Sequence, residues 1–257
     1  MKFDYKKSLG QNFLKDNNII DKIVDSINPN KDDLIIEIGP GNGSLTRKLI
    51  NKECDIICFE IDERLKESLE QIKCDHLRII FKDFLKINLK DYIDKKYKHI
   101  YFVGNLPYYI TTAIINKIIS ESNPYEIIIM IQKEVAERFM SKPCKKEYGS
   151  ISVFLQYNFD IEKVCVVSKN SFEPVPKVDS MVIKLRKSNK YKCNNEDLLY
   201  KFIKDAFRMK RKNIRNNLKE YDLVKIERIL SQINKNLQNR AEELSVEDFI
   251  YMSNNYK

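Results

Sequence analysis

The sequence predicts an α/β domain with a largely parallel sheet, followed by a small all-α domain. Strand-like apolar runs alternate with segments of helical periodicity as far as Arg186, and only helical patterns occur beyond it. Alternation of this kind places helices on both faces of a mostly parallel sheet. We therefore expect one domain over residues 1–186 and a second, helical domain over residues 187–257.

Six runs are predicted to be strands because they are short, apolar and rich in β-branched residues. They are LIIEI (34–38), DIICFE (55–60), LRIIFK (77–82), HIYFV (99–103), EIIIMI (126–131) and SMVIKL (180–185). Apolar residues at helical spacing mark four segments between them, SLTRKLIN (44–51), ERLKESLEQIK (63–73), TTAIINKIIS (111–120) and KEVAERFMS (133–141). Residues 149–167 are ambiguous, since the first half of this segment fits either a helix or a strand.

The composition argues against several classes of protein. The chain has 257 residues, of which 43% are apolar, yet no apolar run approaches the roughly 20 residues of a membrane span. The N-terminal residues lack the apolar stretch of a secretory signal, so we expect a cytoplasmic protein. The six cysteines form no CxxC pair and there are two histidines. This pattern argues against a bound metal, a disulfide framework and covalent catalysis.

Most of the positive charge lies in the last part of the chain. Residues 186–257 hold 17 Lys and Arg against 10 Asp and Glu, out of a net charge of +9. Within them, residues 201–219 carry eight basic side chains and one acidic one. Apolar residues at helical spacing predict one or two amphipathic helices with a basic outer face. Charge alone leaves two readings open, a solvated surface or a surface that binds a polyanion.

Ligands of parallel sheets bind at the carboxyl ends of the strands, so these ends are the candidate site. The first strand runs into EIGPGNGSLT, whose third glycine comes one residue earlier than in the dinucleotide pattern GxGxxG. This spacing favours a nucleoside ligand without a pyrophosphate. Glu60 ends the second strand, where a carboxylate suits ribose hydroxyls. Asp83 ends the third and is placed to accept a hydrogen bond from an adenine amino group.

The fourth strand end carries GNLPYYITT (104–112), in which Pro107 fixes φ and removes a backbone donor. Asn-Leu-Pro-Tyr resembles the (Asp/Asn/Ser)-Pro-Pro-(Tyr/Phe/Trp) signature of methyltransferases that act on exocyclic amines. Together with the other motifs, it makes nearly the whole chain similar to the KsgA-type rRNA adenine dimethyltransferases. These motifs are KKSLGQNFL (6–14), EIGPGNGSLT (37–46), SFEPVPKVDSMVIKL (171–185) and FRMKRKNIRNNL (207–218).

This resemblance implies a Rossmann-like class I methyltransferase domain with a mostly parallel seven-stranded sheet, S-adenosyl-L-methionine as cofactor, and a small helical domain. It also implies dimethylation of the N6 amines of two adjacent adenosines, in a hairpin near the 3′ end of small-subunit rRNA. The partner is then that rRNA or a pre-small ribosomal subunit, and we expect a monomer.

Other readings stay open. Erm-type enzymes, which dimethylate large-subunit rRNA, share most motifs, but LGQNFL, Asp179 and RKNIRNNL favour the small-subunit enzyme. A DNA adenine methyltransferase and a non-catalytic assembly or transcription factor are further alternatives. Two positions depart from the family pattern: Tyr109 stands where Asn is usual, and Thr111 where Ser is common.

The resemblance assigns roles to single residues. The Asn105 side-chain oxygen and the carbonyl of Leu106 or Pro107 would accept the two N–H bonds of the target amine, freeing its lone pair. Tyr108 and Phe172 would hold the adenine between them. Cofactor contacts are expected from Asn12, Leu14, Gly39, Glu60, Asp83 and Asn105. Phosphate contacts are expected from Arg208, Lys210, Arg211, Lys212 and Arg215.

Overall fold

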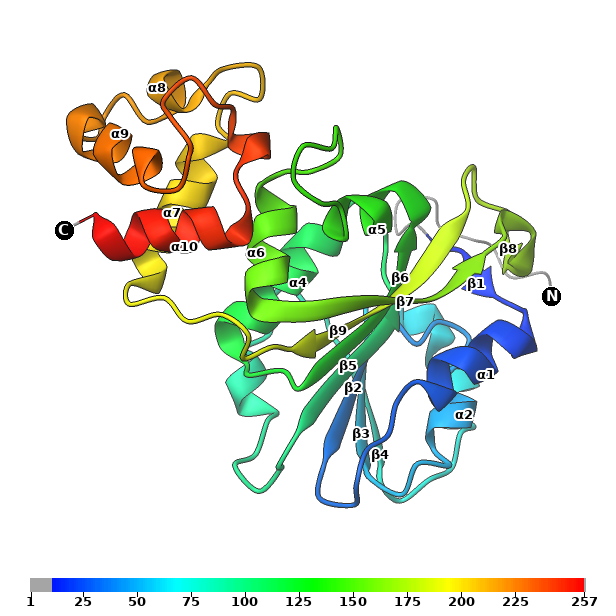
Figure 1. Cartoon of the computed structure of the whole chain (residues 1–257). Coiled ribbons are helices and arrows are strands. Elements are labelled where there is room, and N and C mark those ends of the chain that lie inside the picture. The colour runs from blue at the N-terminus through cyan, green and yellow to red at the C-terminus, as the bar shows by residue number, and fades with distance from the viewer. Residues whose placement is uncertain (1–10, 257) are drawn as a thin grey trace. The chain divides into compact units, whose positions relative to one another are not determined.

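The computed structural model describes residues 11–256, which form two compact units (Figure 1). The first unit runs as far as Ala136 and includes Glu162–Arg186, and the second comprises Glu137–Ile161 and the chain from Lys187 onward. One of the predicted domain limits, after residue 186, coincides with a unit boundary. Residues 137–161, expected in the first domain, cluster instead with the C-terminal helices.

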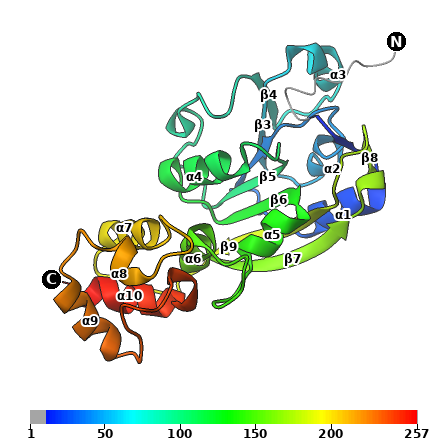
Figure 2. The ribbon, with the colours of Figure 1, turned by 90° about the horizontal axis from the view of Figure 1, so that it is seen from above.

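A seven-stranded sheet forms the centre of the first unit, in the order β4-β3-β2-β5-β6-β9-β7. Figure 2 shows β4 and β7 at opposite edges. The pairs β2–β3, β3–β4, β2–β5 and β5–β6 are parallel, and β6–β9 is antiparallel. The predicted mostly parallel α/β fold is thus confirmed. The strands are β2 (Leu34–Ile38), β3 (Asp55–Glu60), β4 (Leu77–Phe81), β5 (Ile100–Asn105), β6 (Glu126–Gln132), β7 (Phe159–Val167) and β9 (Ser180–Lys187).

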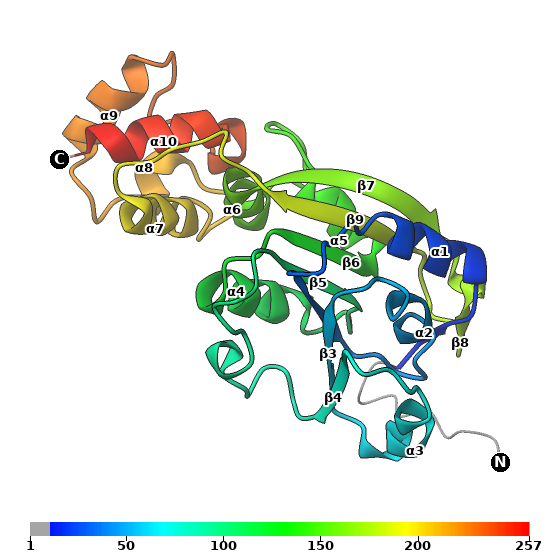
Figure 3. The ribbon, with the colours of Figure 1, turned by 90° about the horizontal axis from the view of Figure 1, so that it is seen from below.

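The central strands β2, β5 and β6 are continuous apolar runs because helices cover both faces of the sheet. In Figures 1 and 3, α1 (Asn17–Asp25) and α2 (Thr46–Leu49) lie on one side of the sheet and α4 (Thr111–Glu121) on the other. Apolar residues of α1 pack with those of the strands in one core cluster. Helix α1 was not predicted, although Ile19, Ile20 and Ile23 have helical spacing. The unit also holds α3 (Lys66–Glu70), most of α5 (Lys133–Phe139) and three short 3-10 helices, η2 (Glu63–Leu65), η3 (Leu89–Asp91) and η4 (Lys169–Ser171).

An ion cluster around a buried carboxylate fixes the antiparallel strand β9. Glu126, at the start of β6, is 2% exposed, and its carboxylate lies 3.1 Å from Lys184 Nζ and 2.7 Å from Arg186 Nε. Lys184 Nζ also donates to the Ser26 carbonyl at 2.8 Å, which ties β9 to the end of α1. Because a one-residue slip would leave this carboxylate buried without its partners, the cluster specifies the register of the pair.

The second unit is helical and has its own apolar core. Its helices are α6 (Ser150–Asn158), α7 (Glu196–Ala206), α8 (Ile214–Asn217), α9 (Leu223–Ser231), the 3-10 helix η5 (Ala241–Glu243) and α10 (Val246–Asn255). Val153 and Tyr157 of α6 belong to this core, which is why residues 137–161 cluster here. The ambiguous segment 149–167 therefore contains both structures, α6 followed by β7. The basic stretch 201–219 forms two helices, and residues 207–213 connect them.

A carboxylate at the end of β2 is buried inside the first unit. Glu37 is 1% exposed, and its Oε2 accepts hydrogen bonds from Thr46 Oγ1 at 2.8 Å and from Cys58 Sγ at 3.4 Å. Loss of hydration disfavours the charged form and raises the pKa of Glu37 from its ordinary 4.5 to about 7. Between about pH 4.5 and 7, Glu37 is therefore mostly protonated in the folded protein and mostly ionised in the unfolded chain.

We predict that Glu37→Gln changes stability in a pH-dependent way. A raised pKa in the folded state means that wild-type stability is fully present below pH 4.5 and falls as the pH rises toward 7. The amide does not titrate, so the free energy of unfolding of the variant should gain up to ~3 kcal/mol relative to wild type between pH 5 and 8. Urea unfolding at three pH values measures this, with the exposed Glu53→Gln as control. A difference that stays constant with pH would refute the prediction.

Candidate active site

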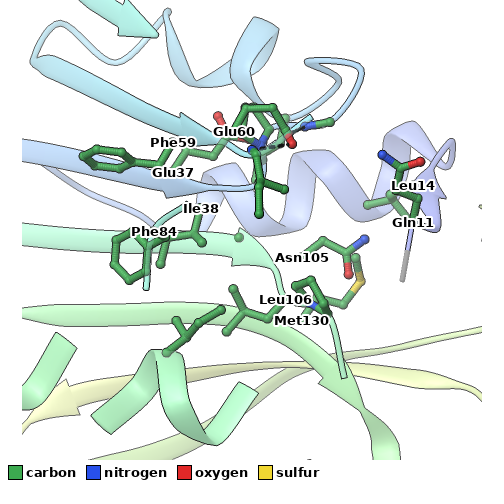
Figure 4. Close-up of a pocket in the computed structure, with 18 of the residues that line it drawn as sticks. Gln11, Leu14, Glu37, Ile38, Phe59, Glu60, Phe84, Asn105, Leu106 and Met130 are labelled. Carbon is green, nitrogen blue, oxygen red and sulfur yellow. Dashed lines mark hydrogen bonds between the residues drawn. The ribbon is translucent and has the colours of Figure 1, made fainter. Parts of the chain in front are cut away.

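A pocket opens at the carboxyl ends of β2, β3 and β5, where each predicted strand-end motif is found (Figure 4). The glycine loop after β2 forms one wall. Gly39 and Gly41 have φ values of 70° and 59°, which are left-handed conformations that favour glycine. A Cβ atom on Gly41 would lie 2.7 Å from Phe13 Cε1. The loop thus needs glycine both for its backbone shape and for the packing of the N-terminal segment against it.

Glu60 joins this loop to the end of β3. Its side chain is 5% exposed, and Oε2 accepts from the Gly41 N–H at 3.0 Å. Oε1 accepts from the N–H groups of Ile61 and Asp62, at 2.8 and 2.9 Å. Burial raises the pKa of Glu60. Figure 4 shows Glu60 on the side of the pocket opposite Asn105, and three backbone donors hold its carboxylate there.

The end of β4 adds a polar and an apolar group to the pocket. Asp83 lines it, and its Oδ1 accepts from the Leu85 N–H at 3.0 Å, so the carboxylate is fixed by its own turn. The neighbouring Phe84 is 5% exposed and packs edge-on against Phe59, with the ring centroids 5.7 Å apart. A flat apolar group can therefore lie beside a hydrogen-bond acceptor here.

The Asn-Leu-Pro-Tyr motif connects the end of β5 to α4. Asn105 Nδ2 donates to the Asn12 carbonyl at 2.8 Å, so the amide oxygen is the acceptor end of this side chain. The Pro107 carbonyl accepts from the Ile110 N–H and from Thr111 Oγ1, both at 3.2 Å. These bonds hold the backbone of the motif in one conformation.

Tyr108 is fixed by a residue that is distant in the sequence. Its hydroxyl lies 3.0 Å from Ser180 Oγ, at the start of β9, and burial raises its pKa. The ring is half-buried and lines the pocket. No local pattern indicated this contact, although Ser180 belongs to the motif at residues 171–185.

The N-terminal segment closes one side of the pocket. The strand β1 (Phe13–Leu14) pairs with β8 (Phe172–Glu173), and Gln11 Nε2 donates to Asp62 Oδ2 at 2.7 Å. Arg64, which pairs with the same carboxylate, lowers the pKa of Asp62 to about 2, so this anchor is charged at neutral pH. The pocket is lined by the backbone or side chains of Asn12 and Leu14, as expected of cofactor contacts. Residues 6–10 of the predicted motif lie outside the described residues.

Phe172 does not line the pocket. Its side chain is 0% exposed and packs in the core cluster with α1 and the sheet. This geometry gives no support to its predicted stacking role. All the other residues predicted for catalysis or for cofactor binding line the pocket. The apolar lining residues Ile38, Ile61 and Met130 were not predicted, because nothing in the sequence distinguishes them from ordinary core residues.

The predicted phosphate-binding residues lie in the second unit, on the connection from α7 to α8 and at the start of α8. We call residues 208–215 the basic loop; Arg208, Lys210, Arg211, Lys212 and Arg215 are all exposed. The side chain of the buried Asn217 holds the backbone of the basic loop in place. Its Oδ1 accepts from the Met209 N–H at 3.0 Å, and its Nδ2 donates to the Met209 and Lys212 carbonyls at 3.3 Å. Five cationic groups are thus displayed on a backbone of fixed shape.

Residues 11–256 contain no group of three or more His, Cys, Asp or Glu side chains arranged to hold a metal ion. Over the same residues, no helix is long and apolar enough to cross a membrane.

Comparisons with known proteins identify the family. The family model described as ribosomal RNA adenine dimethylase matches residues 2–257. The ribosomal RNA small subunit methyltransferase A of Clostridium acetobutylicum is 40% identical over 254 residues, covering 96% of this chain and 92% of that protein. The protein of the same name from Bacillus pumilus is 40% identical over 267 residues, covering 98% and 91%.

Two solved structures share the fold. A dimethyladenosine transferase from Plasmodium falciparum has a TM-score of 0.77 and 26% identity, covering 93% of this chain and 95% of that one. The 23S rRNA methyltransferase ErmE has a TM-score of 0.74 and 25% identity, covering 95% and 99%. The chain belongs to the ribosomal RNA adenine dimethylase family.

Proposed function

We propose that this chain uses S-adenosyl-L-methionine to dimethylate the N6 amines of two adjacent adenosines in a hairpin near the 3′ end of small-subunit rRNA. The observation that carries the proposal is that Asn105 and Leu106, at the end of β5, line the same pocket as Gly39, Glu60 and Asp83, with the Asn105 amide nitrogen already committed to the Asn12 carbonyl. We further propose that the protein works as a monomer in the cytoplasm, on the rRNA or on a pre-small subunit.

The charge of the pocket supports this cofactor over a dinucleotide. Among the groups that line the pocket, the carboxylates of Glu60 and Asp83 outnumber one amine, that of Lys82. Glu37 also lines the pocket, but burial raises its pKa to about 7, so it adds only part of a negative charge at neutral pH. Such a wall repels a pyrophosphate and suits a sulfonium cation. When bound, S-adenosyl-L-methionine supplies the electrophilic methyl group. A carboxylate has about four lone-pair positions, so Glu60 can accept from a ribose hydroxyl in addition to its three backbone donors.

The side of the pocket facing the target must activate a weak nucleophile, because the lone pair of an adenine amine is delocalised into the ring. Asn105 Oδ1 accepts one N–H of that amine. The Pro107 carbonyl already accepts two hydrogen bonds, which leaves the Leu106 carbonyl as the better second acceptor. Acceptors fixed in advance stabilise the positive charge that develops on nitrogen and need no strong base. The anchored ring of Tyr108 gives the extruded base a face to stack on.

The relatives favour small-subunit rRNA over the Erm-type alternative. Proteins named for small-subunit methylation are 40% identical to this chain, whereas the large-subunit enzyme of similar fold is 25% identical. The intact Asn105, Pro107 and Tyr108 argue against a purely non-catalytic assembly factor. Contacts to rRNA phosphates are assigned to the basic loop, since structured RNA is gripped largely through its backbone.

We predict that Asn105→Ala lowers kcat for methyl transfer by about 10²- to 10³-fold, because one fixed acceptor is lost. Transfer of labelled methyl groups to immature small subunits, large subunits and duplex DNA measures this, with Asn51→Ala, on an exposed turn, as control. Label in small-subunit rRNA, recovered as dimethyladenosine, is the expected result. Label confined to large subunits or DNA would assign the protein to another substrate, and full activity of the Asn105 variant would refute the mechanism.

We predict that replacing the five cations of the basic loop by Ala weakens RNA binding and flattens its salt dependence. Each lost phosphate contact should reduce the slope of log K against log[salt] by roughly 0.7 to 0.9. The matched control removes five exposed lysines of the first unit, Lys31, Lys66, Lys73, Lys95 and Lys98. Equal slopes for the two variants would show that net charge, rather than the basic loop, determines binding.

A further inference from the structure

Tyr109 is a large aromatic side chain exposed at the mouth of the pocket. It is 65% exposed and is the most exposed aromatic residue among residues 11–256, yet it also lines the pocket. A single exposed apolar residue on a protein surface needs no explanation. Tyr109, however, follows Asn105 by four residues and lines the same pocket. It therefore lies close to the proposed position of the target base.

The backbone around Tyr109 holds it in this position. The Leu106 N–H donates to the Met130 carbonyl at 3.1 Å, and the Pro107 carbonyl receives both the Ile110 N–H and Thr111 Oγ1. Helix α4 begins two residues further on, at Thr111. These bonds fix the backbone of the loop, so a contact with the ring would order only the Tyr109 side chain and not the chain that carries it.

The two adjacent tyrosines differ in their surroundings. The hydroxyl of Tyr108 is held by Ser180, and its ring is half-buried against the pocket. Tyr109 presents most of its surface to solvent. A base that has entered the pocket meets Tyr108, whereas a base that stays outside at the mouth meets Tyr109.

The chemistry of RNA indicates which group could lie against the Tyr109 ring at the mouth of the pocket. Drawing one adenine out of its stack leaves one face of its neighbour without a stacking partner. The pocket, with the carboxylates of Glu60 and Asp83 in its lining, offers little to the phosphate between the two nucleotides. Stacking on an aromatic ring holds a base without requiring phosphate contacts.

We propose that Tyr109 is a positioning residue that stacks on the nucleotide next to the adenosine being methylated. The proposal rests on the proposed function, and because the two target adenosines are adjacent, this neighbour is the second target. Tyr109 then holds one adenosine at the mouth while the other reacts in the pocket.

The test uses the target hairpin with 2-aminopurine in place of one of the two adenosines, bound to the full-length protein with S-adenosyl-L-homocysteine. 2-Aminopurine lacks the 6-amino group that the proposed acceptors in the pocket bind, so it should occupy the mouth while the remaining adenosine enters the pocket. Its fluorescence is quenched when it stacks on an aromatic ring. Tyr109→Ala should give a several-fold brighter complex and weaken RNA binding by roughly 5- to 150-fold. Tyr109→Phe, which keeps the ring, should behave like wild type.

Tyr125→Ala provides the matched control, because Tyr125 is also exposed but precedes β6 at the amino ends of the strands. An unquenched wild-type complex, or a Tyr109→Ala complex as dark and as tight as wild type, would overturn the proposal. Weaker binding with unchanged fluorescence would also overturn it, since the ring would then contact something other than this base. Methyl transfer by wild-type protein to immature small subunits is measured in parallel, so that failure of the proposed function is distinguished from failure of the stacking contact.

Discussion

The site depends on the reversal of strand order beside β2. The chain builds β2, β3 and β4 outward in one direction and then returns to place β5 on the other side of β2. At such a switch point the loops that follow two neighbouring parallel strands diverge and leave a crevice between them. The glycine loop leaves β2 on one side of this crevice, and Asn105 ends β5 on the other. The proposed nucleoside site and the proposed acceptors for the target amine are therefore adjacent as a consequence of topology.

Side chains join these loops into one rigid unit. Glu60, at the end of β3, accepts from the backbone of the glycine loop, while Asn105 donates to the backbone of the N-terminal segment. That segment is in turn held by the charged Asp62 and by its pairing with β8. Each loop is thus positioned by a partner distant in the sequence. Acceptors held in this way need little reorganisation when charge develops in the transition state.

Local sequence patterns were sufficient for the sheet and for the motifs at its edge. β2 and β3 span the predicted residues, and the strand-end residues Gly39, Glu60, Asp83 and Asn105 line one pocket. Features that depend on packing between distant parts of the chain were not predicted. The short β1–β8 pair joins segments far apart in the chain, and α6 is assigned to the second unit only by its contacts with other helices. Phe172 belongs to a recognisable motif, yet its burial depends on the surrounding core, which sequence spacing does not describe.

The two candidate sites differ in charge, since carboxylates line the pocket of the first unit and the basic loop of the second unit carries five cations. A pocket for a sulfonium needs carboxylates, which would repel an RNA backbone if they were its only contact. The basic loop supplies cations on a separate unit, and the buried Asn217 spends its amide hydrogen bonds on the loop backbone rather than on an ion. Because Asn217 is uncharged, it fixes the loop without neutralising it, whereas a buried carboxylate at this position would pair with the arginines and lysines of the loop. Arg208 also lies 3.5 Å from a Glu220 carboxylate oxygen, but the anchor at Asn217 adds no negative charge of its own. Uncharged anchoring thus orders the basic loop without reducing its net positive charge.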